Sequence, residues 1–213
     1  MTIYALSSGP GTSGVAIIRI SGSQTSEVLK ILTNKPIPKP RMATLRKINN
    51  THTSELIDEG IILWFPGPES YTGEDMAEIH VHGGKAVVLS VQNEISKVKN
   101  CRLAEPGEFT KLAFQNGKIN LLKAESIGDL ISAETEIQRL QAIKVMKGKS
   151  SEKFNQLREK LLKILSFIEA KIDFPEEDLP EENLKKIKQD SSDVLNEINK
   201  ILDDQKVGEI IRE

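Results

Sequence analysis

The sequence predicts an α+β domain over residues 1–118, followed by an all-α helical bundle segment over residues 119–213. Two observations predict this division. Up to Lys118, short β-branched runs alternate with glycine- and proline-rich turns and short helical stretches, which is typical of a mixed domain. After Lys118 the strand patterns stop, and apolar residues recur at the three- and four-residue spacing of helices. The chain therefore changes once, after Lys118, from a mixture of strands and helices to helices alone.

Two strands are predicted near the N-terminus, Ile3–Leu6 and Val15–Ile20, joined by a glycine-rich loop. The loop lacks the G-x-x-x-x-G-K-[ST] spacing of a phosphate-binding loop, and a strand rather than a helix follows it. Arg19 places a fixed positive charge inside the second, otherwise apolar strand. Because an unpaired buried guanidinium is strongly destabilising, Arg19 is expected to have an anionic or hydrogen-bonding partner.

The rest of the first region predicts two more strands and two helices. One strand, Ile61–Phe65, ends at a Pro-Gly-Pro run, and another, Glu78–His82, ends at a glycine pair. The apolar spacing of Val87–Val98 predicts a helix. A proline and a glycine open a further short helix over residues 106–114.

Three helices are predicted after Lys118. Their apolar positions are Ile127, Leu130, Ile131, Ala133, Ile137 and Leu140 in the first, Phe154, Leu157, Leu161, Leu165, Ile168 and Ile172 in the second, and Leu184, Ile187, Val194, Ile198, Ile201 and Leu202 in the third. The proline-containing acidic run IDFPEEDLPEE predicts a loop between the last two.

Charge is distributed unevenly along this helical region. The charged residues from Arg139 to Lys171 are mostly basic, and those from Asp173 to Glu182 are acidic. Such runs are commonly a solvated helix face followed by an acidic loop, and they are also compatible with a face that contacts RNA. The sequence leaves both interpretations open.

Composition excludes several classes of protein. A formal net charge of −2 gives no global basic excess of the kind that nucleic-acid-binding proteins show. The single cysteine, Cys101, excludes an internal disulfide and a cysteine-based metal site, and we interpret it as incidental. The first residues do not resemble a secretory signal, and no apolar run approaches the ~20 residues of a membrane span. The protein is expected to be cytoplasmic, without membrane association.

Residues 70–84, SYTGEDMAEIHVHGG, form the densest cluster of chemically capable side chains. Glu78, His80 and His82 alternate along a predicted strand and therefore share one of its faces. Two histidines at this spacing indicate a metal only weakly, so no metal site is predicted. A strand carboxylate such as Glu78 can accept two parallel hydrogen bonds from the amino-NH edge of a guanine or pterin. The alternative is a salt bridge, with Arg19 as a candidate partner.

Lys118 follows a glycine turn at the junction of the two regions. Its ammonium is a candidate for a ligand-binding cleft, and the alternative is an exposed lysine stabilised by the dipole of the preceding helix.

Four stretches of the chain resemble one protein family over nearly the whole length. They are GTSGVAIIRISG, LWFPGPESYTGEDMAEIHVHGG, RLAEPGEFTKLAFQNGKINLLKAESIGDLISAET and EAKIDFPEED. The family is that of the MnmE (TrmE) bacterial tRNA modification GTPases, and the similarity is to their N-terminal and helical parts.

The resemblance implies a folate-binding domain similar to that of the aminomethyltransferases. It implies that this domain forms a homodimer and binds 5-formyltetrahydrofolate or a related reduced folate, with Arg19, Glu78 and Lys118 as the contacts. It further implies that the full-length protein works with the flavoprotein MnmG in a heterotetramer. This complex adds a carboxymethylaminomethyl or aminomethyl group to the wobble uridine of certain tRNAs.

Family members also carry a potassium-dependent GTPase domain that uses Mg²⁺ and GTP. This sequence has no matching phosphate-binding loop, so no catalytic residue and no GTP hydrolysis are expected of the 213-residue chain. Its end is expected to be where the GTPase insert begins. The alternatives are a free-standing, non-catalytic folate or pterin module, and a helical scaffold that binds a partner protein.

Overall fold

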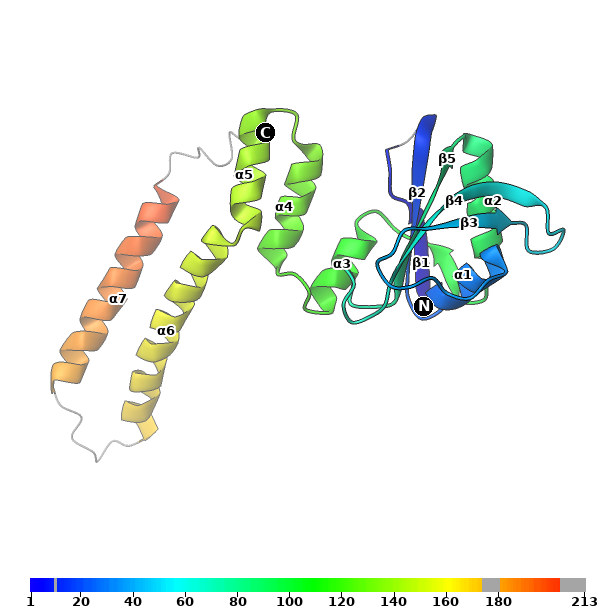
Figure 1. The fold of residues 1–213 in the computed structure, drawn as a ribbon. Helices are drawn as coiled ribbons and strands as arrows, with labels where there is room; N and C mark the ends of the chain where they lie inside the picture. Colours follow the sequence, from blue (N-terminus) through cyan, green and yellow to red (C-terminus); the bar gives the residue numbers. More distant parts are fainter. Residues whose placement is uncertain (10, 174–180, 204–213) are drawn as a thin grey trace. The chain divides into compact units, whose positions relative to one another are not determined.

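The computed structural model describes residues 1–9, 11–173 and 181–203 (Figure 1). Its contacts divide the chain into two compact units, Met1–Asn120 and Leu121–Glu213. The first unit contains a sheet with helices and the second contains helices, so the predicted fold class is confirmed.

The first unit is built on a six-stranded sheet with the order β3-β4-β5-β2-β1-β6. The strands are β1 (Thr2–Leu6), β2 (Ser13–Ser21), β3 (Thr44–Asn49), β4 (Leu56–Phe65), β5 (Met76–Gly83) and β6 (Cys101–Leu103). All neighbours are antiparallel except β1 and β6, which are parallel. β2 and β5, which are far apart in sequence, are therefore direct neighbours at the centre of the sheet.

Alternation of apolar and polar residues along the central strands places the core on one face of the sheet. The buried residues of that face come from β2, β4 and β5, and α1 (Thr25–Thr33) and α2 (Lys85–Ser96) pack against them. They include Ala16, Ile18, Ile20, Ile62, Trp64, Ala77, Ile79 and Val81 from the strands, and Val28, Leu29, Leu32, Val91 and Ile95 from the helices. Residues at the alternate positions of these strands, Arg19 and Glu78 among them, lie on the opposite face of the sheet, which is its second face.

A long loop between β4 and β5 and the helix α3 (Glu108–Gln115) complete the first unit. The predicted strands and helices of this region are present, with ends shifted by a few residues. β4 begins five residues before the predicted Ile61, because residues 56–60 continue the ladder with β3. α1, β3 and β6 were not singled out from the sequence.

The second unit contains α4 (Leu121–Ser132), α5 (Glu136–Met146), α6 (Lys149–Asp173) and α7 (Glu181–Leu202). The prediction of one helix through residues 127–140 is wrong, since Thr135 begins a new helix. Its hydroxyl accepts from the main-chain N–H of Gln138 at 3.3 Å, and the Gln138 side chain accepts from the N–H of Thr135 at 3.0 Å. This reciprocal capping box satisfies two N–H groups that a helix start leaves unpaired.

α6 and α7 pack through Leu157, Ile164 and Val194. Leu157 and Val194 are among the predicted apolar positions, but Ile164 is not, and the predicted Leu161 and Leu165 are exposed. The predicted acidic loop falls mainly on residues 174–180 and the chain end on residues 204–213, and both stretches lie outside the described residues. Among the described helices, none is long and apolar enough to cross a bilayer.

Candidate functional site

Arg19 and Glu78 contact each other on the sheet face opposite the core. They occupy paired register positions on β2 and β5, and their side chains are 30% and 16% exposed. The guanidinium donates to the carboxylate oxygen Oε1 of Glu78, through Nε at 3.1 Å and through Nη2 at 2.8 Å. The expectation of an anionic partner for Arg19 is confirmed, and that partner is the one named by the salt-bridge alternative.

The other carboxylate oxygen of Glu78 is less engaged. Oε2 lies 3.4 Å from Nε2 of His80, which is beyond the usual length of a hydrogen bond to nitrogen. A carboxylate offers about four lone-pair sites to donors. Glu78 therefore keeps the capacity to accept hydrogen bonds from a ligand while it is paired with Arg19.

His82 pairs with Asp58 of β4, a residue that the sequence analysis did not single out. The His82 ring nitrogen Nδ1 lies 2.8 Å from Oδ1 of Asp58, and its main-chain N–H donates to Oδ2 at 2.8 Å. Burial acts to raise the pKa of Asp58, but the hydrogen bonds from His82 outweigh it and bring the pKa below its ordinary value. His80 and His82 thus contact different carboxylates, and the described part of the chain contains no group of three His, Cys, Asp or Glu residues suited to a metal ion.

Two aromatic rings flank the Arg19 guanidinium. Its Cζ lies 5.9 Å from the centre of the Tyr71 ring and 5.7 Å from that of the Phe109 ring, within the range of a cation–π contact. Tyr71 comes from the β4–β5 loop and Phe109 from α3, and a 3.0 Å hydrogen bond between the hydroxyls of Tyr71 and Thr110 joins these segments. The sequence analysis did not select the two aromatic residues, although both lie in the SYTGED and PGEFT stretches of the resemblance.

Lys118 lies beside the same loop, just beyond the end of α3. Gly117 adopts a positive φ of 68°, and the Lys118 N–H donates to the Ala113 carbonyl at 2.8 Å, which ends the helix. A Cβ added at Gly73 of the loop would lie 3.3 Å from Cε of Lys118. The Lys118 side chain is exposed, and no salt bridge to it is found among residues 1–9, 11–173 and 181–203.

Cys101 does not show the features of a reactive thiol. It lies half-buried at the start of β6, and burial raises its pKa more than the nearby N-terminal ammonium lowers it. Since the thiolate is the nucleophilic form, this environment disfavours reactivity. The structure agrees with the interpretation of Cys101 as incidental.

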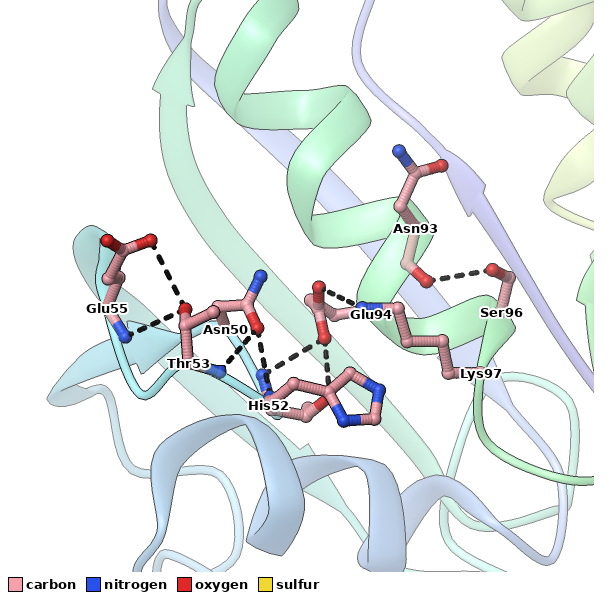
Figure 2. A network of polar contacts seen from close by, with 9 residues as sticks. Asn50, His52, Thr53, Glu55, Asn93, Glu94, Ser96 and Lys97 are labelled. Atoms are coloured by element: carbon pink, nitrogen blue, oxygen red, sulfur yellow. Dashed lines mark hydrogen bonds and ion pairs between the residues drawn. The ribbon is translucent and has the colours of Figure 1, made fainter.

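A separate polar cluster surrounds Glu94 on α2, beside a cavity of about 720 Å³ (Figure 2). The Glu94 carboxylate accepts from the N–H of Thr51 at 3.0 Å, from its hydroxyl at 2.5 Å and from the Lys97 ammonium at 2.6 Å. Burial raises the pKa of Glu94, but the bonds from Lys97 and Thr51 prevail and lower it to about 2. The arrangement fastens the β3–β4 turn to α2, so we assign it a structural role.

Two family models match this chain. The model for the N-terminus of the GTP-binding protein TrmE matches residues 2–118, and the model for the MnmE helical domain matches residues 121–213. Their boundary falls where the strand patterns stop.

Curated relatives point to the same family. The tRNA modification GTPase MnmE of Pelagibacter ubique (strain HTCC1062) is 75% identical over 213 residues, which cover 100% of this chain and 48% of the relative. The proteins of the same name from Rickettsia bellii (strain OSU 85-389) and Rickettsia akari (strain Hartford) are 45% and 46% identical over 211 and 210 residues, or 99% of this chain and 47% of each relative. The chain spans about half the length of these relatives. With both of its regions matched, the chain belongs to the MnmE (TrmE) family of tRNA modification GTPases.

Proposed function

We propose that this chain is the reduced-folate-binding and dimerising part of a tRNA modification GTPase. Arg19, Glu78 and Lys118, the contacts implied by the family resemblance, all belong to the first unit. The observation that carries the proposal is the Arg19–Glu78 pair with two aromatic rings close to the guanidinium, and the exposed Lys118 side chain beside the loop that supplies one of the rings. Such a set suits a ligand with a flat amino-bearing ring and an anionic end.

The site residues divide three tasks among them in this proposal. Glu78 accepts the amino and ring N–H groups of the pterin of 5-formyltetrahydrofolate. Arg19 and Lys118 meet the formyl, carbonyl or glutamate groups, and Tyr71 and Phe109 offer faces for stacking. The bound folate supplies a one-carbon unit to the modification reaction.

The second sheet face offers a surface for the proposed homodimer. The strand register places four residues in one row across β3, β4, β5 and β2, and they are Leu45, Ile61, His80 and Ile17. Leu45 is 65% exposed and Ile61 40%, and Val15, two residues before Ile17 on β2, is 57% exposed. Exposed apolar residues grouped on one face are a common feature of protein interfaces. We propose a second copy of this chain as the occupant.

The activity of the whole protein is part of the same proposal. Together with the flavoprotein MnmG, in a heterotetramer, it would modify the wobble uridine of certain tRNAs and hydrolyse GTP with K⁺ and Mg²⁺. The relatives named tRNA modification GTPase support this activity, and each is about twice as long as this chain. The GTP-binding groups are not part of this sequence, so the 213-residue chain is not expected to bind or hydrolyse GTP.

Calorimetric titration of 5-formyltetrahydrofolate into the 213-residue chain tests the folate proposal. Saturable binding is expected. As a matched control ligand, p-aminobenzoylglutamate retains the anionic end but lacks the pterin edge that Glu78 would bind, so it should bind much more weakly. Absence of binding by a folded chain, or equal binding of the two compounds, would contradict the proposal.

A further inference from the structure

Thr72 lies between the Arg19–Glu78 pair and Lys118. It is fully buried in the β4–β5 loop. Its hydroxyl lies 2.7 Å from the hydroxyl of Ser21, two residues after Arg19 on β2. Its carbonyl accepts a 2.7 Å hydrogen bond from the side-chain amide of Asn116, two residues before Lys118. Thr72 is thus bonded to the sheet on one side and to the segment after α3 on the other.

Gly73, the next residue of the loop, lies against the Lys118 side chain. Gly73 has a φ of +81°, and a Cβ built there would lie 3.3 Å from both Cβ of Asn116 and Cε of Lys118. The lysine stem therefore occupies space that is open because residue 73 has no side chain. The positions of Asn116 and Lys118 relative to the loop are coupled through this contact.

Restraint of a lysine matters for binding, because its flexible stem loses rotamer freedom when the ammonium engages an anion. If the folded chain has already restricted the stem, less entropy is lost on binding. A hydrogen bond that holds the Lys118 segment against the loop thereby favours ligand binding without touching the ligand.

We propose that Asn116 is a positioning residue for the ligand site. Its hydrogen bond to the Thr72 carbonyl, together with Gly73, holds the Lys118 ammonium at a set place relative to the Arg19–Glu78 pair. The site is thereby arranged in advance for a ligand whose anionic group and amino-bearing ring lie at opposite ends. The inference rests on the proposed folate binding.

A double-mutant cycle between Asn116→Ala and Lys118→Ala tests the proposal. Asn116→Ala keeps the Cβ that lies near Gly73 and removes the amide. Calorimetric titration of 5-formyltetrahydrofolate is expected to show an affinity loss of about five-fold for Asn116→Ala in the parent chain, the effect of one hydrogen bond. In the Lys118→Ala background the loss should fall below about two-fold, because the group that Asn116 positions is gone. Asn116→Gln, which retains an amide donor, should recover part of the affinity.

Asn50→Ala is the matched control. The Asn50 side chain also bonds to the main chain in a turn, accepting from the N–H groups of His52 at 2.9 Å and Thr53 at 3.0 Å (Figure 2). That turn bonds to Glu94 of α2 through Thr51, and α2 packs on the sheet face opposite Arg19 and Glu78, so Asn50→Ala should leave folate affinity unchanged. Thermal melts establish that each variant is folded.

The outcomes separate this inference from the proposed function. If the parent chain binds no folate, the proposed function fails and the inference with it. If the parent binds but folded Asn116→Ala has unchanged affinity, or loses equally in both backgrounds, Asn116 does not act through Lys118. The positioning inference is then overturned while the folate proposal stands.

Discussion

Arg19 directs two of its nitrogens to the same oxygen of Glu78. Nε and Nη2 both donate to Oε1, at 3.1 and 2.8 Å, while Oε2 stays 3.4 Å from the His80 ring. A ligand that donates two N–H groups to this carboxylate would meet one engaged oxygen and one available oxygen. The ion pair and the proposed ligand contact therefore share one carboxylate. Substitutions can measure the contribution of each to ligand binding.

Glu78→Gln should weaken binding of 5-formyltetrahydrofolate by at least ~10-fold. The change replaces a charged acceptor pair with one acceptor and one donor that opposes the pterin N–H groups. Hydrogen bonds to a charged group contribute roughly 1.5 to 3 kcal/mol, and about 1.4 kcal/mol corresponds to a tenfold change in affinity. Calorimetric titration measures the loss. Glu59→Gln, at an exposed position of β4, is the control, and parent-like affinity in folded Glu78→Gln would reduce Glu78 to an ion-pair partner.

The double variant Arg19→Ala with Glu78→Gln should lose less affinity than the sum of the two single losses. Each single change removes the same ion pair and leaves its partner without its charge complement. Residues in direct contact generally couple in this way. Titration of the parent, both single variants and the double variant gives the coupling free energy. Strict additivity would mean that the two side chains act on the ligand independently.

Lys118→Ala should reduce folate affinity by a smaller factor than Glu78→Gln. The Lys118 side chain is exposed, and solvent and salt screen its interaction with an anion. The loss should also shrink as the salt concentration of the titration rises, whereas that of Glu78→Gln should change little. A larger and salt-independent loss would contradict the assignment of Lys118 to the solvent-facing end of the ligand.

Leu45→Glu should convert the proposed dimer to a monomer. A charge at an exposed apolar position costs little in an isolated chain but is strongly unfavourable in the middle of an apolar interface. Light scattering at micromolar concentration should show the mass fall from twice 23.7 kDa to 23.7 kDa. Leu89→Glu introduces the same charge on α2, where Leu89 is also exposed, and should leave the dimer intact. A parent chain that is already monomeric would rule out the dimer.

Glu94→Gln should destabilise the first unit at neutral pH, and its deficit relative to the parent should shrink in acid. The pKa of Glu94 lies at about 2 in the folded chain against an ordinary 4.5, so the folded state favours the ionised carboxylate. This stabilisation is fully present above about pH 4.5 and is lost as the pH falls toward 2. Denaturant unfolding at several pH values measures the difference, expected at about 1 to 3 kcal/mol at pH 7. If the loss of stability in Glu94→Gln did not depend on pH, it would come from altered packing and not from the charge of Glu94.

Local patterns account for the parts of the fold that the sequence analysis obtained. The period of two in Val15–Ile20 and Glu78–His82, and the helical spacing from residue 154 onward, each depend on neighbours a few residues apart. The break between α4 and α5 was missed because apolar spacing continues across it. The Thr135 and Gln138 capping residues were the local signal that distinguishes two helices from one.

For the candidate site, local sequence patterns establish that Arg19 is a charge within an apolar strand and that Glu78, His80 and His82 share one strand face. Tertiary structure alone decided that Arg19 meets Glu78, that His82 turns to Asp58, and that Tyr71 and Phe109 flank the guanidinium. The reason is that strand parity is fixed by local geometry, whereas register between β2 and β5 is fixed by long-range burial of residues such as Ile18 and Ile79 in one core.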